Sequence, residues 1–271
     1  MAGGTELLST LNANPRELRA GLSVVLITKN EQAKIERCLR SVGFADEIVV
    51  LDGASQDATA RLARDLGARV EVDPDWPGFG AQKNRVLAMA SHAWVLSLDA
   101  DEVVTPELAQ SVSEVVRGDQ TAAANGYWIN RRSCLGSRVV RFGDWQSDRV
   151  LRLCRNGAGR FSNLPVHEQL ECAPPLARLD GFLMHYTWDS VSDALAKVRR
   201  YAQAGAPALA SRGRGGLPAA TTHAVWTLLR GLIFRLGFLD GWSGLCVAGV
   251  NAYGTWCRYR LAGRLRDQQG V

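Results

Sequence analysis

Short apolar runs alternate with amphipathic stretches over the first 116 residues of the chain. The runs at 22–28 and 94–98 contain neither Gly nor Pro and read as buried strands. Further strands are predicted at 47–51 and 69–72, and helices at 32–42, 57–66, 81–90 and 106–116. Apolar strands that alternate with helices predict an α/β fold, in which a mainly parallel sheet is flanked by helices on both faces.

The pattern becomes less regular after residue 126. Strands are predicted at 127–131 and 150–154, and a helix at 190–204. The sequence SRGRGGLP at 211–218 is typical of a linker, and the segment after it is apolar, rich in Trp and interrupted by arginines. The predicted organisation is a polar lead-in (1–20), a Rossmann-like domain (21–210, with halves 21–125 and 126–210), a linker (211–218) and a helical appendage (219–271).

Composition narrows the class of protein. The six cysteines are scattered, with no CxxC pair or zinc-type spacing, which favours reduced thiols. The N-terminus lacks a basic leader followed by an apolar core, so we expect a cytoplasmic protein. The formal charge is −3 over residues 1–140 and +8 over 141–271, which suggests an anionic partner for the C-terminal half.

Residues 236–256 approach the length of a membrane span, but Asp240, Asn251 and several glycines argue against one. Two interpretations stay open for this region. It lies at the inner face of the cytoplasmic membrane, with its arginines against an anionic membrane surface, or it is an ordinary helical subdomain.

The most informative stretch is WVLSLDADE at 94–102, where an apolar run ends in Asp99, Asp101 and Glu102. Asp99 and Asp101 are two residues apart, so in a strand they would point the same way. Burying two carboxylates without a counter-charge costs roughly several kcal/mol for each of them. A divalent cation carried on a diphosphate would compensate their negative charge. The alternative is an acidic loop before the helix that begins near Pro106.

Polar residues also follow the earlier predicted strands. Thr28, Asn30 and Glu31 precede a helix and are placed either to bind a nucleotide or to cap that helix. Asp52 stands at a strand tip before Gly53 and suits a carboxylate that accepts a hydrogen bond from a base.

The glycines of GFGAQKN at 78–84 permit close approach to a ligand. Lys83, within this motif, is either a phosphate ligand or an ordinary exposed lysine.

The motifs LITKNE, VVLDGASQDAT, GFGAQKN and LDADE occur in this order over residues 22–102. This joint pattern resembles the inverting family 2 glycosyltransferases of the GT-A fold. The resemblance implies a nucleotide-sugar donor and a Mg²⁺ or Mn²⁺ ion. By position it assigns Asp101 to the metal and assigns nucleotide-sugar binding to Thr28, Asn30, Glu31, Asp52, Lys83, Asn84 and Asp99.

The second half of the chain narrows the resemblance. Segments such as RFGDW (141–145), FSNLPVHEQL (161–170) and GFLDGWSGL (237–245) are similar to the bacterial β-glucosyltransferase-like enzymes of the lipopolysaccharide core. The implied reaction moves glucose from a UDP-sugar donor to an inner-core heptose acceptor. Another envelope glycan or lipid-linked acceptor stays open, as does a sugar-nucleotide-binding module without activity. The tail lacks Gln-x-x-Arg-Trp, so we expect single additions and not polymer synthesis.

An inverting transfer needs a base for the acceptor hydroxyl, and His167-Glu168 stands where many family members carry an acidic pair. We expect Glu168 to be the base and His167 to orient it, although either could accept the proton and both could form surface hydrogen bonds instead. Arg149, Arg152 and His185 are further candidate contacts to the diphosphate or the acceptor.

Two other classes fit less well. A sugar-nucleotide pyrophosphorylase would show a Gly-rich basic signature after the first strand, where this chain has TKNE. A nucleic-acid-binding module would explain the basic tail but not the acidic motifs of the first half, so no nucleic-acid partner is expected.

Overall fold

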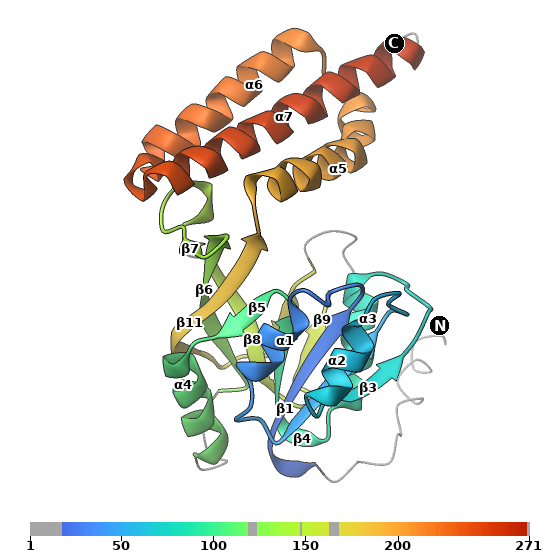
Figure 1. Ribbon diagram of the computed structural model, residues 1–271, viewed down its shortest axis with the longest axis vertical. Coiled ribbons are helices and arrows are strands. Elements are labelled where there is room, and N and C mark those ends of the chain that lie inside the picture. Colours follow the sequence, from blue (N-terminus) through green and yellow to red (C-terminus); the bar gives the residue numbers. More distant parts are fainter. Residues whose placement is uncertain (1–17, 119–123, 147, 163–167, 270–271) are drawn as a thin grey trace, which may run out of the picture. The chain divides into compact units, whose positions relative to one another are not determined.

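The computed structural model describes residues 18–118, 124–146, 148–162 and 168–269 (Figure 1). The strands are β1 (Arg19–Thr28), β2 (Glu47–Asp52), β3 (Arg69–Val72), β4 (His92–Asp99), β5 (Glu102–Val104), β6 (Gly126–Leu135), β7 (Arg138–Val139), β8 (Asp148–Arg155), β9 (Gly159–Phe161), β10 (Leu170–Cys172) and β11 (Leu176–Trp188). The α-helices are α1 (Ile35–Arg40), α2 (Thr59–Asp65), α3 (Phe79–Met89), α4 (Pro106–Arg117), α5 (Val191–Ala210), α6 (Leu217–Leu229) and α7 (Trp242–Gln269). Shorter helical turns are η1 (Gly143–Trp145), η2 (Arg230–Phe234) and η3 (Gly237–Asp240).

The chain forms two compact units. The first contains the described residues of 1–100, 106–129 and 151–179, and the second contains those of 101–105, 130–150 and 180–271. This division differs from the predicted domains, because three segments before residue 211 group with the C-terminal helices. Residues 211–216 of the predicted linker lie between α5 and α6, and Leu217 and Pro218 belong to α6.

A nine-stranded mixed sheet has the order β3-β2-β1-β4-β8-β6-β11-β5, with β7 paired to β6. Strands β1 to β4 are parallel, and β8 runs antiparallel to β4. The register sets Thr28 beside Asp52 and Ile27 beside Asp99, so the polar residues that end these strands share one edge. This is the edge at which parallel α/β sheets bind their ligands.

Strand β1 is central to the first unit, and its residues from Val24 to Leu26 are fully buried. One cluster of the core joins β1, β2 and β4 to Val86 and Ala90 of the α3 region. A strand buried on both faces reads as an unbroken apolar run, which explains why LSVVLIT predicted it correctly.

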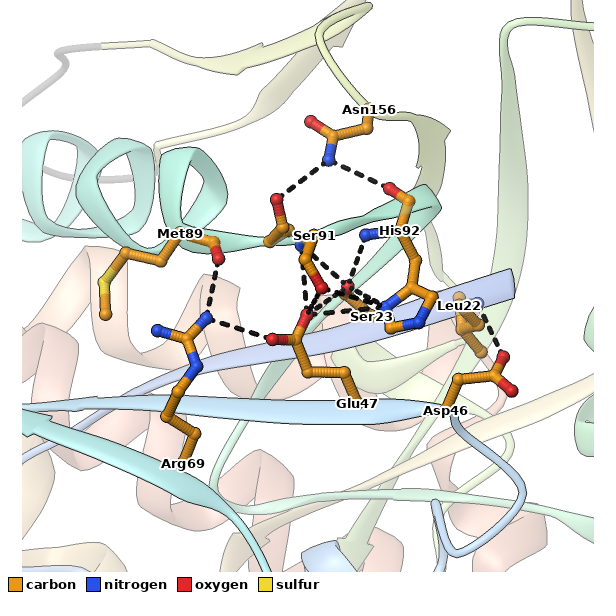
Figure 2. Close-up of polar contacts among 10 residues, drawn as sticks. Leu22, Ser23, Asp46, Glu47, Arg69, Met89, Ser91, His92 and Asn156 are labelled. Atoms are coloured by element: carbon orange, nitrogen blue, oxygen red, sulfur yellow. Dashed lines mark hydrogen bonds and ion pairs between the residues drawn. The ribbon is translucent and has the colours of Figure 1, made fainter. Parts of the chain in front are cut away.

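The opposite ends of these strands carry a buried polar network (Figure 2). Glu47 accepts hydrogen bonds from the Ser23 hydroxyl (2.6 Å) and from the backbone and side chain of Ser91 (3.0 and 2.9 Å). Ser23 also lies 3.1 Å from Nδ1 of His92, and Arg69 bonds the other Glu47 oxygen at 3.0 Å. Burial acts to raise the pKa of Glu47, but these hydrogen bonds outweigh it and lower the pKa to about 2. His92 therefore has a structural role, far from the ligand edge.

The second unit joins short strand pairs to three long helices. Strand β5 pairs antiparallel with β11, and α7 packs against both α5 and α6. The RFGDW motif anchors this helical region, since Asp144 accepts hydrogen bonds from Arg230 (2.9 Å), Arg235 (3.0 Å) and Asn251 (3.3 Å). In the part of the chain that the structure describes, no helix combines the length and hydropathy needed to cross a membrane.

The glycines of this region are required by close packing. A Cβ on Gly244 would lie 1.8 Å from the carbonyl oxygen of Gly237, and one on Gly237 would lie 2.6 Å from that of Gly231. The motif GFLDGWSGL is thus explained by backbone contacts within the turn that joins α6 to α7.

The observed elements confirm the predicted fold class: a mainly parallel sheet flanked by helices, followed by a helical C-terminal region. Strand β1 begins at Arg19, inside the predicted lead-in, and α5 extends to Ala210, six residues beyond the predicted end.

Candidate active site

The loops that follow β1 and β2 bind each other. The backbone N–H of Asn30 donates to the Ser55 hydroxyl (2.8 Å), and the Asn30 side-chain oxygen accepts from the N–H of Gln56 (2.8 Å). The N–H of Glu31 donates to the Thr59 hydroxyl at 2.8 Å. Asn30 has a φ of 58°, a left-handed conformation that Asn tolerates better than most residues. The predicted nucleotide residues Asn30 and Glu31 thus also fix the shape of this edge.

Asp52 lies beneath these loops and is 1% exposed. Its Oδ1 accepts from the hydroxyls of Thr28 (2.9 Å) and Ser55 (2.6 Å), and its Oδ2 accepts from the N–H of Ser55 (2.8 Å). A carboxylate offers about four acceptor positions, so one remains on Oδ2. Thr28 and Asp52 are therefore brought together as expected, with most of the Asp52 hydrogen-bonding capacity used inside the protein.

Trp76 was not among the predicted site residues, although it packs directly on this loop. A Cβ added to Gly53 would lie 2.6 Å from Cε3 of Trp76, so only glycine fits between the indole and the loop. The ammonium of Lys29 lies 5.7 Å from the centre of the Trp76 ring, and Phe79 meets its edge. The sequence did contain a signal for this role: an aromatic residue between two prolines, just before the glycine-rich motif.

Four charged side chains form a cluster where β4 ends. Lys83, which is 4% exposed, lies 2.7 Å from Oδ1 of Asp99 and 2.9 Å from Oε1 of Glu168. Arg152, 6% exposed, lies 2.6 Å from Oδ2 of Asp99. The cluster has two carboxylates and two cations, so its formal charges cancel. Of the two alternatives for Lys83, the structure excludes an exposed lysine.

The electrostatic state of Asp99 follows from this pairing. Burial acts to raise its pKa, but the positive charges of Arg152 and Lys83 outweigh burial and hold the pKa of Asp99 well below its usual range. Asp99 therefore remains a carboxylate throughout the physiological range. Arg152, predicted as a possible diphosphate or acceptor contact, here orients Asp99.

Asn84 forms a two-sided clamp on β9. Its Nδ2 donates to the carbonyl of Phe161 (2.9 Å), and its Oδ1 accepts from the N–H of the same residue (2.8 Å). Phe161 is buried, and its ring lies 5.2 Å from the Lys83 ammonium. Asn84 thus ties α3 to β9, while its predicted contact to the nucleotide stays a prediction. His167 lies outside the described residues.

The second unit contains the other predicted site residues. Oδ2 of Asp101 lies 3.4 Å from Nε2 of His185, and the Thr187 hydroxyl lies 3.1 Å from Nδ1 of that imidazole. The pairing of β5 with β11 sets His185 beside Glu102, the residue after Asp101. Arg149 is exposed on β8, with no role assigned to it by the geometry.

Glu102, the third acidic residue of the motif, differs from Asp99 and Asp101 in being fully buried. Its side chain is fully buried, and Arg131 lies 3.4 Å from Oε1 of Glu102 while also pairing with Asp148. A buried carboxylate held by an arginine that is itself paired is typical of a structural network.

A divalent cation would not find a complete protein site here. Among the described residues, no group of three or more His, Cys, Asp or Glu side chains is arranged to hold a metal ion. Asp101 and His185 nevertheless provide one carboxylate and one imidazole nitrogen, both largely buried. Such a pair fits a cation that obtains its other ligands from a diphosphate and water.

Comparisons with known proteins agree with the motifs. The family model for glycosyl transferase family 2 matches residues 23–155. An uncharacterized glycosyltransferase of Rickettsia typhi is 26% identical over 254 residues, which cover 88% of this chain and 85% of the relative. The lipopolysaccharide core biosynthesis glycosyltransferase LpsC of Rhizobium meliloti is 29% identical over 187 residues, or 66% of this chain and 68% of LpsC.

Among solved structures, the glucosyl-3-phosphoglycerate synthase of Mycobacterium tuberculosis in complex with Mn²⁺, UDP and glucosyl-3-phosphoglycerate is 30% identical. The match covers 43% of this chain and 44% of that one, with a TM-score of 0.32.

Residues 23–155 are therefore a family 2 glycosyltransferase domain, and the protein is a glycosyltransferase. The family match contains all four motifs on which the resemblance was first based.

Proposed function

We propose that this glycosyltransferase moves a hexose from a UDP-sugar to a lipopolysaccharide-core acceptor with inversion at the anomeric carbon. The observation that carries the proposal is the charged cluster at the end of β4, in which Lys83 joins Asp99 to Glu168 within the family 2 domain. It brings a predicted nucleotide-binding carboxylate and the predicted base onto one ammonium.

The nucleotide would bind at the edge formed by the loops after β1 and β2. There the Thr28–Asp52 pair leaves one acceptor position on Asp52 for the imide N–H of uracil. Asp99, kept ionised by Lys83 and Arg152, would accept hydrogen bonds from the ribose hydroxyls.

Asp101 and His185 would hold a divalent cation, and Thr187 would orient the imidazole. A mixed oxygen and nitrogen set suits Mn²⁺ better than Mg²⁺, which prefers oxygen ligands alone. When bound, the cation would neutralise charge on the departing diphosphate.

Glu168 would act as the base. It would take the proton of the acceptor hydroxyl as the hydroxyl oxygen attacks the anomeric carbon and the bond to the diphosphate breaks. The Lys83 ammonium lies 2.9 Å from Oε1 of Glu168 and holds this side chain in place. His167 lies outside the described residues, and the proposal rests on Glu168 because of its contact with Lys83.

Glucose as the sugar and an inner-core heptose as the acceptor are supported by the lipopolysaccharide-core resemblance of the second half. LpsC, a relative along 66% of this chain, is named for lipopolysaccharide core biosynthesis, which supports an acceptor in the core.

The test is mass spectrometry of lipopolysaccharide from cells that lack this protein, combined with transfer from UDP-glucose by the purified enzyme. The proposal predicts a core short of one hexose, which the enzyme restores in vitro when Mn²⁺ is present. An unchanged core would reject the acceptor. Binding of UDP without transfer to any envelope glycan would instead support a sugar-nucleotide-binding module.

A further inference from the structure

The turn that joins α6 to α7 exposes an unusual amount of apolar surface. Ten large apolar side chains between residues 225 and 245 are exposed, compared with six in the rest of the described chain. Phe234 and Trp242 are each 68% exposed, and Trp226 is 52% exposed. We call residues 225–245 the apolar turn. A concentration of this kind marks an interaction surface and not the scatter of single apolar residues that any protein shows.

The polar groups of the apolar turn are used within the protein. Arg230 and Arg235 both bond Asp144, and Asp240 accepts from the N–H groups of Arg141 and Phe142. The charges near this surface are therefore largely compensated, which leaves its apolar side chains as the outward feature.

The exposed surface continues along one face of α7. Trp242, Leu245 and Gly249 are exposed, and the same helical spacing leads through Tyr253 and Trp256. Positions three or four apart lie on one side of a helix, so these residues form a single stripe. Arg260 and Arg264 follow at the same spacing.

The far end of this stripe is a cationic groove between α5 and α7. Arg199 of α5 joins Arg260 and Arg264 of α7 around a cavity of about 210 Å³, with Tyr253 and Trp256 in its wall. No carboxylate lines the groove, and within the described part of the chain no acidic side chain pairs with Arg260 or Arg264. The whole segment 211–271 carries eight arginines against two acidic residues. This arrangement fits phosphate groups.

We propose that the apolar turn and the α7 stripe dock the protein on an anionic lipid surface. Apolar and aromatic side chains would enter the boundary between headgroups and acyl chains, where Trp and Tyr are favoured. The arginines of the groove would meet lipid phosphates. This inference concerns the second unit alone and does not depend on the transfer reaction.

A second copy of the chain fits this surface less well. In a symmetric dimer the stripe would meet its own copy either antiparallel or parallel. An antiparallel match places arginines against apolar side chains, and a parallel match places arginines against arginines. Both leave the guanidinium groups without a counter-charge.

The experiment is co-sedimentation of the full chain with vesicles of phosphatidylcholine, with and without phosphatidylglycerol. The proposal expects binding that requires phosphatidylglycerol and weakens with salt. The double variant Phe234→Ser/Trp242→Ser should weaken it by about tenfold or more, and so should Arg260→Gln/Arg264→Gln. All four side chains are at least partly exposed, and circular dichroism would verify that the variants are folded.

Matched controls come from other surfaces. Tyr201→Ser removes an aromatic side chain that is 64% exposed on α5, and Arg61→Gln/Arg64→Gln removes two exposed charges from α2. Both should bind as the unaltered protein does. Equal binding to uncharged vesicles, or full binding by either test variant, would overturn the proposal. So would a dimer in lipid-free solution that Phe234→Ser/Trp242→Ser dissociates without loss of vesicle binding.

Discussion

The ammonium of Lys83 lies 2.9 Å from the carboxylate of Glu168, which is 85 residues away in the sequence. Lys83 belongs to the GFGAQKN motif and was a predicted phosphate ligand, and Glu168 was predicted to be the base. Because of this contact, a substitution that removes the charge of either residue changes the electrostatic surroundings of the other.

Replacing Glu168 with Gln should lower kcat for sugar transfer by about 10²–10⁴-fold, since a positioned base contributes that much. The affinity for UDP should change little, because the amide retains a hydrogen-bonding group near Lys83. Steady-state kinetics and UDP calorimetry would measure the two effects. Glu171→Gln, on the exposed face of β10, is the control and should retain full activity. A Glu168→Gln enzyme with normal kcat would remove Glu168 from the mechanism.

Replacing Lys83 with Met should destabilise the protein by about 1–3 kcal/mol, because two carboxylates would lose the cation between them. This loss of stability is smaller than that expected for a fully buried ion pair, because the Asp99 side chain is 32% exposed. Denaturant unfolding would measure it, and the double variant Lys83→Met/Glu168→Gln should recover part of the loss. If Lys83 served only to bind phosphate, the single variant would unfold like the parent protein.

Replacing His185 with Ala should weaken Mn²⁺ activation about 10–100-fold without abolishing transfer at high Mn²⁺ concentration. Asp101→Asn should not be rescued in this way, because the carboxylate supplies the charge. Calorimetry of UDP with and without Mn²⁺ gives a second readout that is independent of turnover. His223→Ala, which alters an imidazole stacked on Tyr259, is the matched control. Equal Mn²⁺ dependence in the His185 and His223 variants would exclude His185 as a ligand.

The polar edge of the sheet could be predicted from the sequence because each strand and the polar residues that end it are neighbours in the chain. Apolar runs gave the strands, and residues such as Thr28 and Asp52 had to meet once their parallel strands paired in register. The contacts of Asp99 were not predictable in the same way. Arg152 and Lys83 reach it from an antiparallel strand and a helix whose packing no periodicity specifies.

Other site features were missed for similar physical reasons. The pairing of β5 with β11 brings His185 to Asp101 from 84 positions later, and such long-range antiparallel pairing leaves no trace in local spacing. Trp76 was not among the predicted site residues. Its role depends on the absence of a side chain at Gly53, which becomes visible only when the two segments are placed together.

Protonation of Glu47 should destabilise the protein at acid pH. Its pKa is about 2 in the folded state and 4.5 ordinarily, so its contribution is complete above about pH 4.5 and is lost as the pH falls toward 2. The difference between the two pKa values corresponds to about 3 kcal/mol for this side chain, which is 16% exposed. Glu47→Gln should therefore lower the free energy of unfolding near neutral pH, and the gap to the parent protein should close between pH 4.5 and 2. Urea unfolding at several pH values would measure it, with the exposed Glu71→Gln on β3 as the control. A gap that stayed constant with pH would mean that the Glu47 charge does not stabilise the fold, and that its hydrogen bonds from Ser23 and Ser91 serve a neutral acceptor equally well.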